Sequence, residues 1–194
     1  PRSTLFPSPT LFRSIPGDTH IDLPYLPPDL WSEQAPAKWR LRAPRAEELE
    51  DGLHWFVEGR DLGMWNGVGP GFLKYTPGMF GHIDEMKAVG FEWNNHRGAQ
   101  PRPTTPELRL ADLDKDGVDA EIIYGCLMIN DLINDPNQRC WADKVYNDWA
   151  ADFAKRSDPN RVFPLAIVPN NDPQEAAAEV RRCADVLPNL SLAE

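Results

Sequence analysis

The sequence predicts an α/β protein whose strands run parallel. Two observations over residues 105–194 indicate this class: amphipathic helical stretches alternate with short apolar runs typical of buried strands, and helix-capping residues separate the two. Helices that alternate with buried strands form βαβ units with right-handed crossovers. An open flavodoxin-like sheet and half of a TIM barrel both fit the four strands and three helices expected, and periodicity alone does not separate them.

The N-terminal residues are treated in two parts. Residues 1–14 contain TLFPSPTLFRS, which resembles the translation of a sequencing adapter; a proline-broken disordered arm is the alternative, and both readings exclude these residues from the fold. Residues 15–23 are predicted to form a short strand. Asp18, His20 and Asp22 alternate there with Thr19, Ile21 and Leu23 and therefore share one face.

Residues 24–104 form a long Trp- and Pro-rich segment after the first strand. The segment carries five of the seven tryptophans, whereas a disordered linker would be depleted in aromatic residues. We therefore expect an ordered, irregular insertion. The tryptophans are expected either to pack within it or to line a substrate pocket; the five are Trp31, Trp39, Trp55, Trp65 and Trp93.

Regular elements follow from residue 105. Thr105 as N-cap and Gly117 as the left-handed end predict a helix over 106–116. A strand is predicted over 118–124, followed by a helix over 140–156. The apolar stripe of that helix is Trp141, Val145, Trp149 and Phe153, with Asp143, Lys144 and Asp148 outside it.

The last elements repeat this order. A strand is predicted over 162–168, and Asp172-Pro173 opens a helix that reaches about residue 186. Residues 190–193 begin a fourth strand.

Composition excludes several classes of function. The formal charge of −10 argues against nucleic-acid and anionic-membrane partners, and no apolar run is long enough to cross a bilayer. The first residues lack the features of a signal peptide. Cys126, Cys140 and Cys183 are odd in number and show no CxxC spacing, which favours free thiols in a cytoplasmic protein.

Two clusters have metal-like spacing. His20 and Asp22 lie two residues apart on a strand, so both can face one metal ion, although a histidine on a strand is more often a hydrogen-bonded structural group. Residues 112–117 (DLDKDG) resemble the start of an EF-hand calcium loop. The twelfth position would be Ile123 in place of the bidentate glutamate, so a solvated helix end is expected instead.

Four stretches carry a resemblance in collinear order: GDTHIDLPYLPPDLW (17–31), PELRLADLDKDGVDAEIIYG (106–125), YNDWAADF (146–153) and PNNDPQEAAAEVRR (169–182). Together they resemble the amidohydrolase-related family, which includes aminocarboxymuconate semialdehyde decarboxylase. The resemblance covers residues 15–194 and implies the N-terminal half of a (β/α)8 TIM barrel, with the first four strands, the insertion over 24–104 and the active site at the carboxyl ends of the strands.

The resemblance also implies chemistry. His20 matches the first histidine of the family's His-x-His metal pair, and Asp22 stands where the second would be. The implied cofactor is a divalent metal, zinc, and the implied substrate is a small carboxylated or cyclic organic molecule, with a homo-oligomer possible for the full-length form. Hydrolysis and non-oxidative decarboxylation both fit these residues, and so does a non-catalytic half-barrel binding protein.

The catalytic residues are expected beyond Glu194. The 194-residue chain is therefore expected to be inactive by itself, to bind zinc weakly and to be poorly soluble. A reading frame that continues past Glu194 with histidines at strand ends would favour the enzyme over the binding protein.

Overall fold

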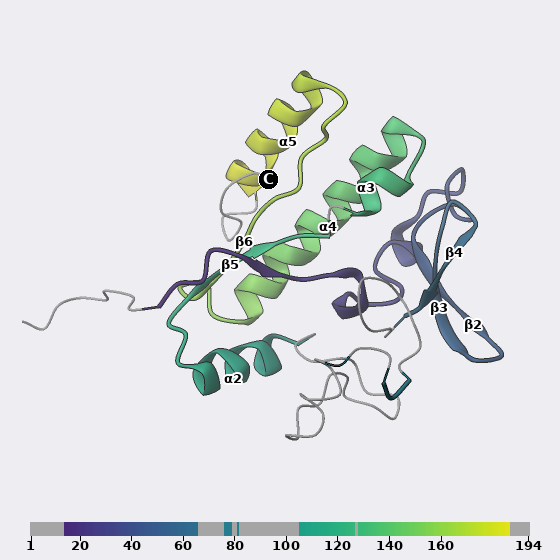
Figure 1. Cartoon of the computed structure of the whole chain (residues 1–194). Coiled ribbons are helices and arrows are strands. Elements are labelled where there is room, and N and C mark those ends of the chain that lie inside the picture. Colours follow the sequence, from purple (N-terminus) through teal and green to yellow (C-terminus); the bar gives the residue numbers. More distant parts are fainter. Residues whose placement is uncertain (1–13, 66–75, 79–80, 82–104, 127, 187–194) are drawn as a thin grey trace, which may run out of the picture.

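The computed structural model describes residues 14–65, 76–78, 81, 105–126 and 128–186. Its first sheet contains the strands β1 (Thr19–His20), β5 (Glu121–Tyr124) and β6 (Val162–Pro164) in the order β1-β5-β6 (Figure 1). Both pairs are parallel, with Thr19 opposite Ile123 and Glu121 opposite Val162. The prediction of a parallel sheet is confirmed for these strands. The fourth predicted strand lies outside the described residues.

All three strands are shorter than predicted, β5 beginning at Glu121 instead of residue 118, and prolines lie where β1 and β6 end. Predicted over 15–23, β1 has only two ladder residues, and Leu23 already begins the 3-10 turn η1 (Leu23–Tyr25), which contains Pro24. The alignment nevertheless extends beyond the ladder: Asp119 donates its N–H to Ser14, and Ile21 donates to Tyr124. Similarly, β6 ends at Pro164 instead of residue 168.

The helices α2 (Pro106–Asp116), α4 (Pro136–Arg156) and α5 (Pro173–Val186) alternate with the strands, as predicted. The Thr105 hydroxyl accepts the Leu108 N–H, and Gly117 ends α2 at φ 69°. The predicted start of α4 at residue 140 is wrong. Asp135 caps the helix and Pro136 occupies its first turn, so α4 begins four residues earlier. The short helix α3 (Met128–Leu132) precedes it.

One layer of helices covers one face of the parallel sheet. Helix α4 contacts β6, α2 and α5, and its Val145 and Phe153 are buried in the core. The prediction that Asp143 lies outside the buried stripe is wrong, because Asp143 is only 2% exposed. Helix α4 packs on the sheet and also on the segment after β1, so a wider arc of its surface is buried than a single stripe. Among the described residues, no helix is long and apolar enough to cross a membrane.

The segment between β1 and β5 contains a second sheet that periodicity did not predict. Strands β2 (Arg45–Leu49), β3 (Gly52–Val57) and β4 (Arg60–Met64) form an antiparallel meander, and the 3-10 turn η2 (Ser32–Gln34) precedes it. Gly59, at φ 74°, takes the left-handed conformation required by the tight β3–β4 turn. The expected irregular segment is thus partly regular.

The second sheet and the chain before it dock on α3 and on the first half of α4 (Figure 1). The Trp31 indole donates to the Ala142 carbonyl at 3.0 Å, and Arg60 donates to the Leu132 carbonyl at 2.9 Å. Trp31 packs edge-on against the fully buried Trp55. Packing is therefore the use that the structure gives these two tryptophans; Trp93 lies outside the described residues.

Candidate functional site

The candidate site is at the carboxyl end of β1. His20 is the last residue of the strand, and its ring stacks on Tyr124 of β5 with ring centres 5.8 Å apart. Buried Glu121, Ile123 and Val162 alternate along β5 and β6 with half-buried residues, so the His20 ring lies on the face that the helix layer does not cover. The His20 side chain keeps 49% of its surface exposed, which leaves it accessible to a ligand.

Two aspartates flank the His20 ring. Nε2 lies 2.9 Å from Asp18 Oδ1, and Nδ1 lies 3.9 Å from Asp22 Oδ1. The structure therefore brings together the two predicted ligands, His20 and Asp22. It also places Asp18, the third member of the alternating set, in contact with the nitrogen that faces away from Asp22.

The described residues fit a metal ion only in part. Zinc–nitrogen and zinc–oxygen bonds of about 2.0–2.2 Å allow an imidazole and a carboxylate 3.9 Å apart to share one ion. A catalytic zinc site generally uses three protein ligands, and within the described ranges no group of three or more metal-binding side chains is found. His20 and Asp22 are thus two candidate ligands of an incomplete set. The part of residues 112–117 that resembled a calcium loop is the end of α2, as expected.

A buried ion pair between α2 and β5 contacts the backbone of the candidate site. This pair was not predicted from the sequence. Arg109 on α2 and Glu121 on β5 are 6% and 1% exposed and form two hydrogen bonds of 2.6 Å. Arg109 also donates to the His20 carbonyl. The partial signal in the sequence was a glutamate inside an apolar strand, since a buried carboxylate requires a partner.

Tyr25 is a further polar group beside this site. Burial raises the pKa of its hydroxyl, and the charge of Asp22 raises it further, while Arg109 acts in the opposite direction. The hydroxyl therefore remains protonated at neutral pH and can donate a hydrogen bond.

His54 forms a second histidine–aspartate cluster, in the antiparallel sheet. Its Nδ1 lies 3.0 Å from Asp61, and its Nε2 lies 3.1 Å from Asp51. A hydrogen bond from the Gly63 N–H lowers the pKa of Asp61, and the hydrogen bond from His54 lowers it further. His54 is 8% exposed and lies within the sheet, which fits a structural role for this histidine. His82 and His96 lie outside the described residues.

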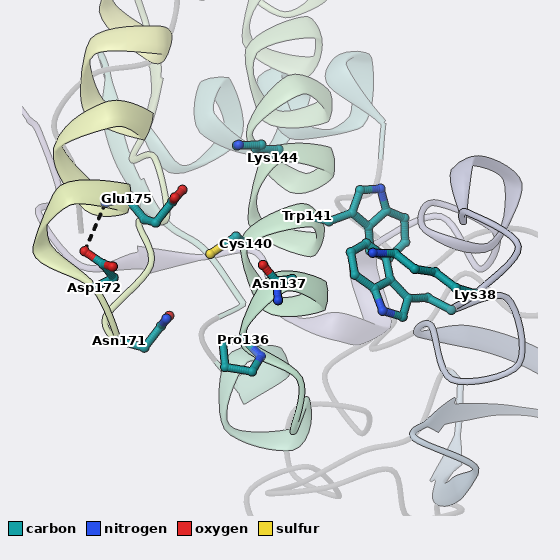
Figure 2. A pocket seen from close by; sticks show the side chains of 10 residues that line it. Lys38, Pro136, Asn137, Cys140, Trp141, Lys144, Asn171, Asp172 and Glu175 are labelled. Carbon is teal, nitrogen blue, oxygen red and sulfur yellow. Dashed lines mark hydrogen bonds between the residues drawn. The ribbon is translucent and has the colours of Figure 1, made fainter.

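A groove of about 570 Å³ opens between the first turns of α4 and α5 (Figure 2). Figure 2 shows the Cys140 sulfur on the side of Glu175. The Trp141 ring lies against the Trp39 ring, with ring centres 5.6 Å apart. Burial raises the pKa of the Cys140 thiol, and nearby carboxylates raise it further. The thiol is therefore protonated at neutral pH and is a weak nucleophile, so Cys140 is not activated for covalent chemistry. Its lining residues are Lys38, Trp39, Pro136, Asn137, Cys140, Trp141, Lys144, Asn171, Asp172 and Glu175.

Comparison with known proteins supports the fold. No family model matches the chain, and no curated protein matches it. Among solved structures, the chain is similar to an amidohydrolase from Mycobacterium avium subsp. paratuberculosis K-10, with a TM-score of 0.59 and 16% sequence identity. The match covers 91% of this chain and 48% of that one, so the chain spans about half the length of this neighbour. The described α/β architecture is therefore similar in fold to the matched part of that neighbour.

Proposed function

We propose that the protein is a metal-dependent hydrolase of the amidohydrolase type that acts on a small carboxylated or cyclic organic molecule. In this proposal His20 and Asp22 are two of the metal ligands, the sheet is part of a (β/α)8 barrel, and parts of the protein other than the described residues supply the remaining ligands and the catalytic base. The observation that carries the proposal is the approach of His20 to Asp22 at the carboxyl end of a parallel strand, the edge at which barrel enzymes of this class hold their active sites.

The local chemistry supports these roles. A bound divalent ion, zinc by the resemblance, would lower the pKa of a bound water or polarise a substrate carbonyl. His20 would supply a neutral nitrogen and Asp22 a negative charge that offsets part of the charge of the ion. Tyr124, stacked on His20, would restrict the rotation of the imidazole ring. The protonated Tyr25 hydroxyl is a candidate hydrogen-bond donor to a substrate oxygen.

The test is calorimetric zinc titration of the wild-type chain and of the variants His20→Ala and Asp22→Asn. Each substitution is expected to weaken zinc binding at least about tenfold, because each removes one ligand. Asp29→Asn is the matched control, since Asp29 is an exposed aspartate of the same region without an assigned role. Unchanged affinity in both ligand variants would overturn the assignment of His20 and Asp22.

Turnover assays of the full-length form separate the two reactions that the site would serve, because the 194-residue chain is expected to be inactive by itself. Small cyclic amides and lactones report hydrolysis, and aromatic carboxylic acids report release of carbon dioxide. Metal-dependent loss of the cyclic substrates supports the hydrolase, whereas carbon dioxide release from the acids identifies a carboxy-lyase of the same fold.

One observation favours a different function, a binding protein without catalysis. Asp18 lies 2.9 Å from Nε2 of His20, so one ring nitrogen is already engaged by a carboxylate. Asp18→Asn weakens that contact. If the zinc affinity rises in this variant while the full-length form turns over no substrate, Asp18 competes with the metal for His20 and the binding protein is the better assignment.

A further inference from the structure

Arg109 forms an ion pair with Glu121 and, in addition, donates a hydrogen bond to a backbone carbonyl. Its Nε and Nη2 each donate to one oxygen of Glu121, which satisfies the carboxylate on both sides. Its Nη1 then remains available and donates to the His20 carbonyl at 3.3 Å. Because the bidentate pairing with Glu121 neutralises the charge of the guanidinium, Arg109 can lie close to a cation site without strongly repelling the cation.

The His20 carbonyl belongs to a peptide group that is held on both sides. The same peptide carries the Ile21 N–H, which donates to the Tyr124 carbonyl at 3.0 Å. The carbonyl and the N–H of one peptide point in opposite directions, so Tyr124 and Arg109 hold the group from opposite sides. This peptide directly follows the Cα atom of His20 and precedes Asp22 by one residue. Its orientation therefore sets the direction of the chain between the two candidate ligands.

The end of β1 needs this support because it has little of its own. The strand contains two residues, and the side chains of His20 and Asp22 are 49% and 60% exposed. Arg109 lies on α2, more than eighty residues away in the sequence, and is itself buried by the helix layer. The buried helix layer thus contacts the backbone beside the exposed ligand pair through the Arg109 guanidinium.

We propose that Arg109 is the positioning residue of the candidate metal site: together with the Tyr124 carbonyl, it fixes the His20–Ile21 peptide and thereby the relative positions of His20 and Asp22. The relevance to metal binding rests on the proposed function, whereas the restraint on the peptide does not.

The test uses Arg109→Met combined with Glu121→Met. Replacing both partners of a buried ion pair by apolar side chains of similar length leaves no unpaired charge, so the fold is expected to be retained. In NMR experiments the Ile21 amide is expected to exchange with solvent about tenfold faster, because its peptide is then held on one side only. The zinc affinity, followed by the His20 ring signals, is expected to fall by a similar factor of about ten.

Two further variants keep the test decisive. Arg109→Lys retains the charge but cannot pair bidentately with Glu121 while also reaching the His20 carbonyl, so it is expected to accelerate Ile21 exchange even if the double variant does not fold. Arg161→Met is the matched control: Arg161 also donates to backbone carbonyls, those of Val118 and Asp119, at the opposite end of β5. It is expected to leave Ile21 exchange unchanged.

The outcomes are distinguishable. Unchanged Ile21 exchange in both Arg109 variants would overturn the restraint itself. Faster exchange with undiminished zinc affinity would overturn the positioning role. If the exchange becomes faster but zinc does not shift the His20 signals of the wild-type chain, the restraint is supported and the proposed metal function fails.

Discussion

His20 and His54 each lie between two aspartates, yet the two clusters differ in exposure to solvent and in position in the fold. His20 ends a short parallel strand, is half exposed and approaches Asp18 and Asp22 of its own segment. His54 lies in the middle strand of the antiparallel sheet, is buried, and joins the β2–β3 turn to β4 through Asp51 and Asp61. The comparison shows that histidine–aspartate proximity alone does not define a site, because only the His20 cluster, the proposed ligand site, is accessible at a strand end.

The largest effect is expected from the core beneath the antiparallel sheet. Trp55→Ala removes a side chain that is 0% exposed and packs on Trp31, so it should lower the free energy of unfolding by about 3–5 kcal/mol. Urea denaturation followed by circular dichroism measures this. A loss below about 1 kcal/mol would show that the antiparallel sheet does not depend on this packing.

Removal of His54 should have the next largest effect. In His54→Ala the Asp61 and Asp51 carboxylates lose their common partner and a cavity forms, so a loss of about 1–3 kcal/mol is expected. The comparison of clusters predicts a clear order: the urea midpoint should fall in His54→Ala and remain almost unchanged in a variant of His20. Equal midpoints for the two variants would contradict the structural role of His54.

The Asp61 carboxylate gives the antiparallel sheet a dependence on pH. Hydrogen bonds from Gly63 and His54 lower the pKa of Asp61 below its ordinary value of 3.8. Protons therefore bind the unfolded chain more readily, so this contribution to stability is fully present above pH 3.8 and is lost as the pH falls below it. Asp61→Asn should accordingly narrow the difference between the urea midpoints at pH 6 and pH 3. An unchanged difference would show that Asp61 is not the group responsible.

The smallest effect is expected at the candidate site. His20→Ala removes a half-exposed ring at a strand end and should change the free energy of unfolding by no more than about 0.5 kcal/mol. Thermal denaturation in the absence of added metal checks this. A marked loss would mean that His20, like His54, is a structural residue.

Local sequence signals predicted the parallel part of the fold well. The Thr105 cap, Gly117 and the Asp172-Pro173 start lie where the structure has them, because a cap depends only on a few neighbouring residues. The start of α4 was missed although Asp135-Pro136 is the same kind of signal. The apolar stripe over 140–156 drew attention to the middle of the helix instead of its first turn.

The antiparallel sheet was less predictable. Its strands carry charged residues at Arg45, Glu47 and Glu48, so their alternation does not mark an apolar face. What stabilises this sheet is contact with distant elements, such as Trp31 with Ala142 and Arg60 with Leu132. Contacts between residues far apart in the chain leave no period in the local sequence.

By itself the sequence determined the α/β class, the parallel order of strands and the His20–Asp22 pair, because periodicity, capping and strand alternation are properties of neighbouring residues. Only the tertiary structure decided that Asp143 is buried, that His54 joins two strands and that Arg109 reaches from α2 to the His20 carbonyl. The physical reason is common to all three. Burial and long-range hydrogen bonds depend on which surfaces meet when the chain folds, and that meeting is set by the packing of whole elements against one another.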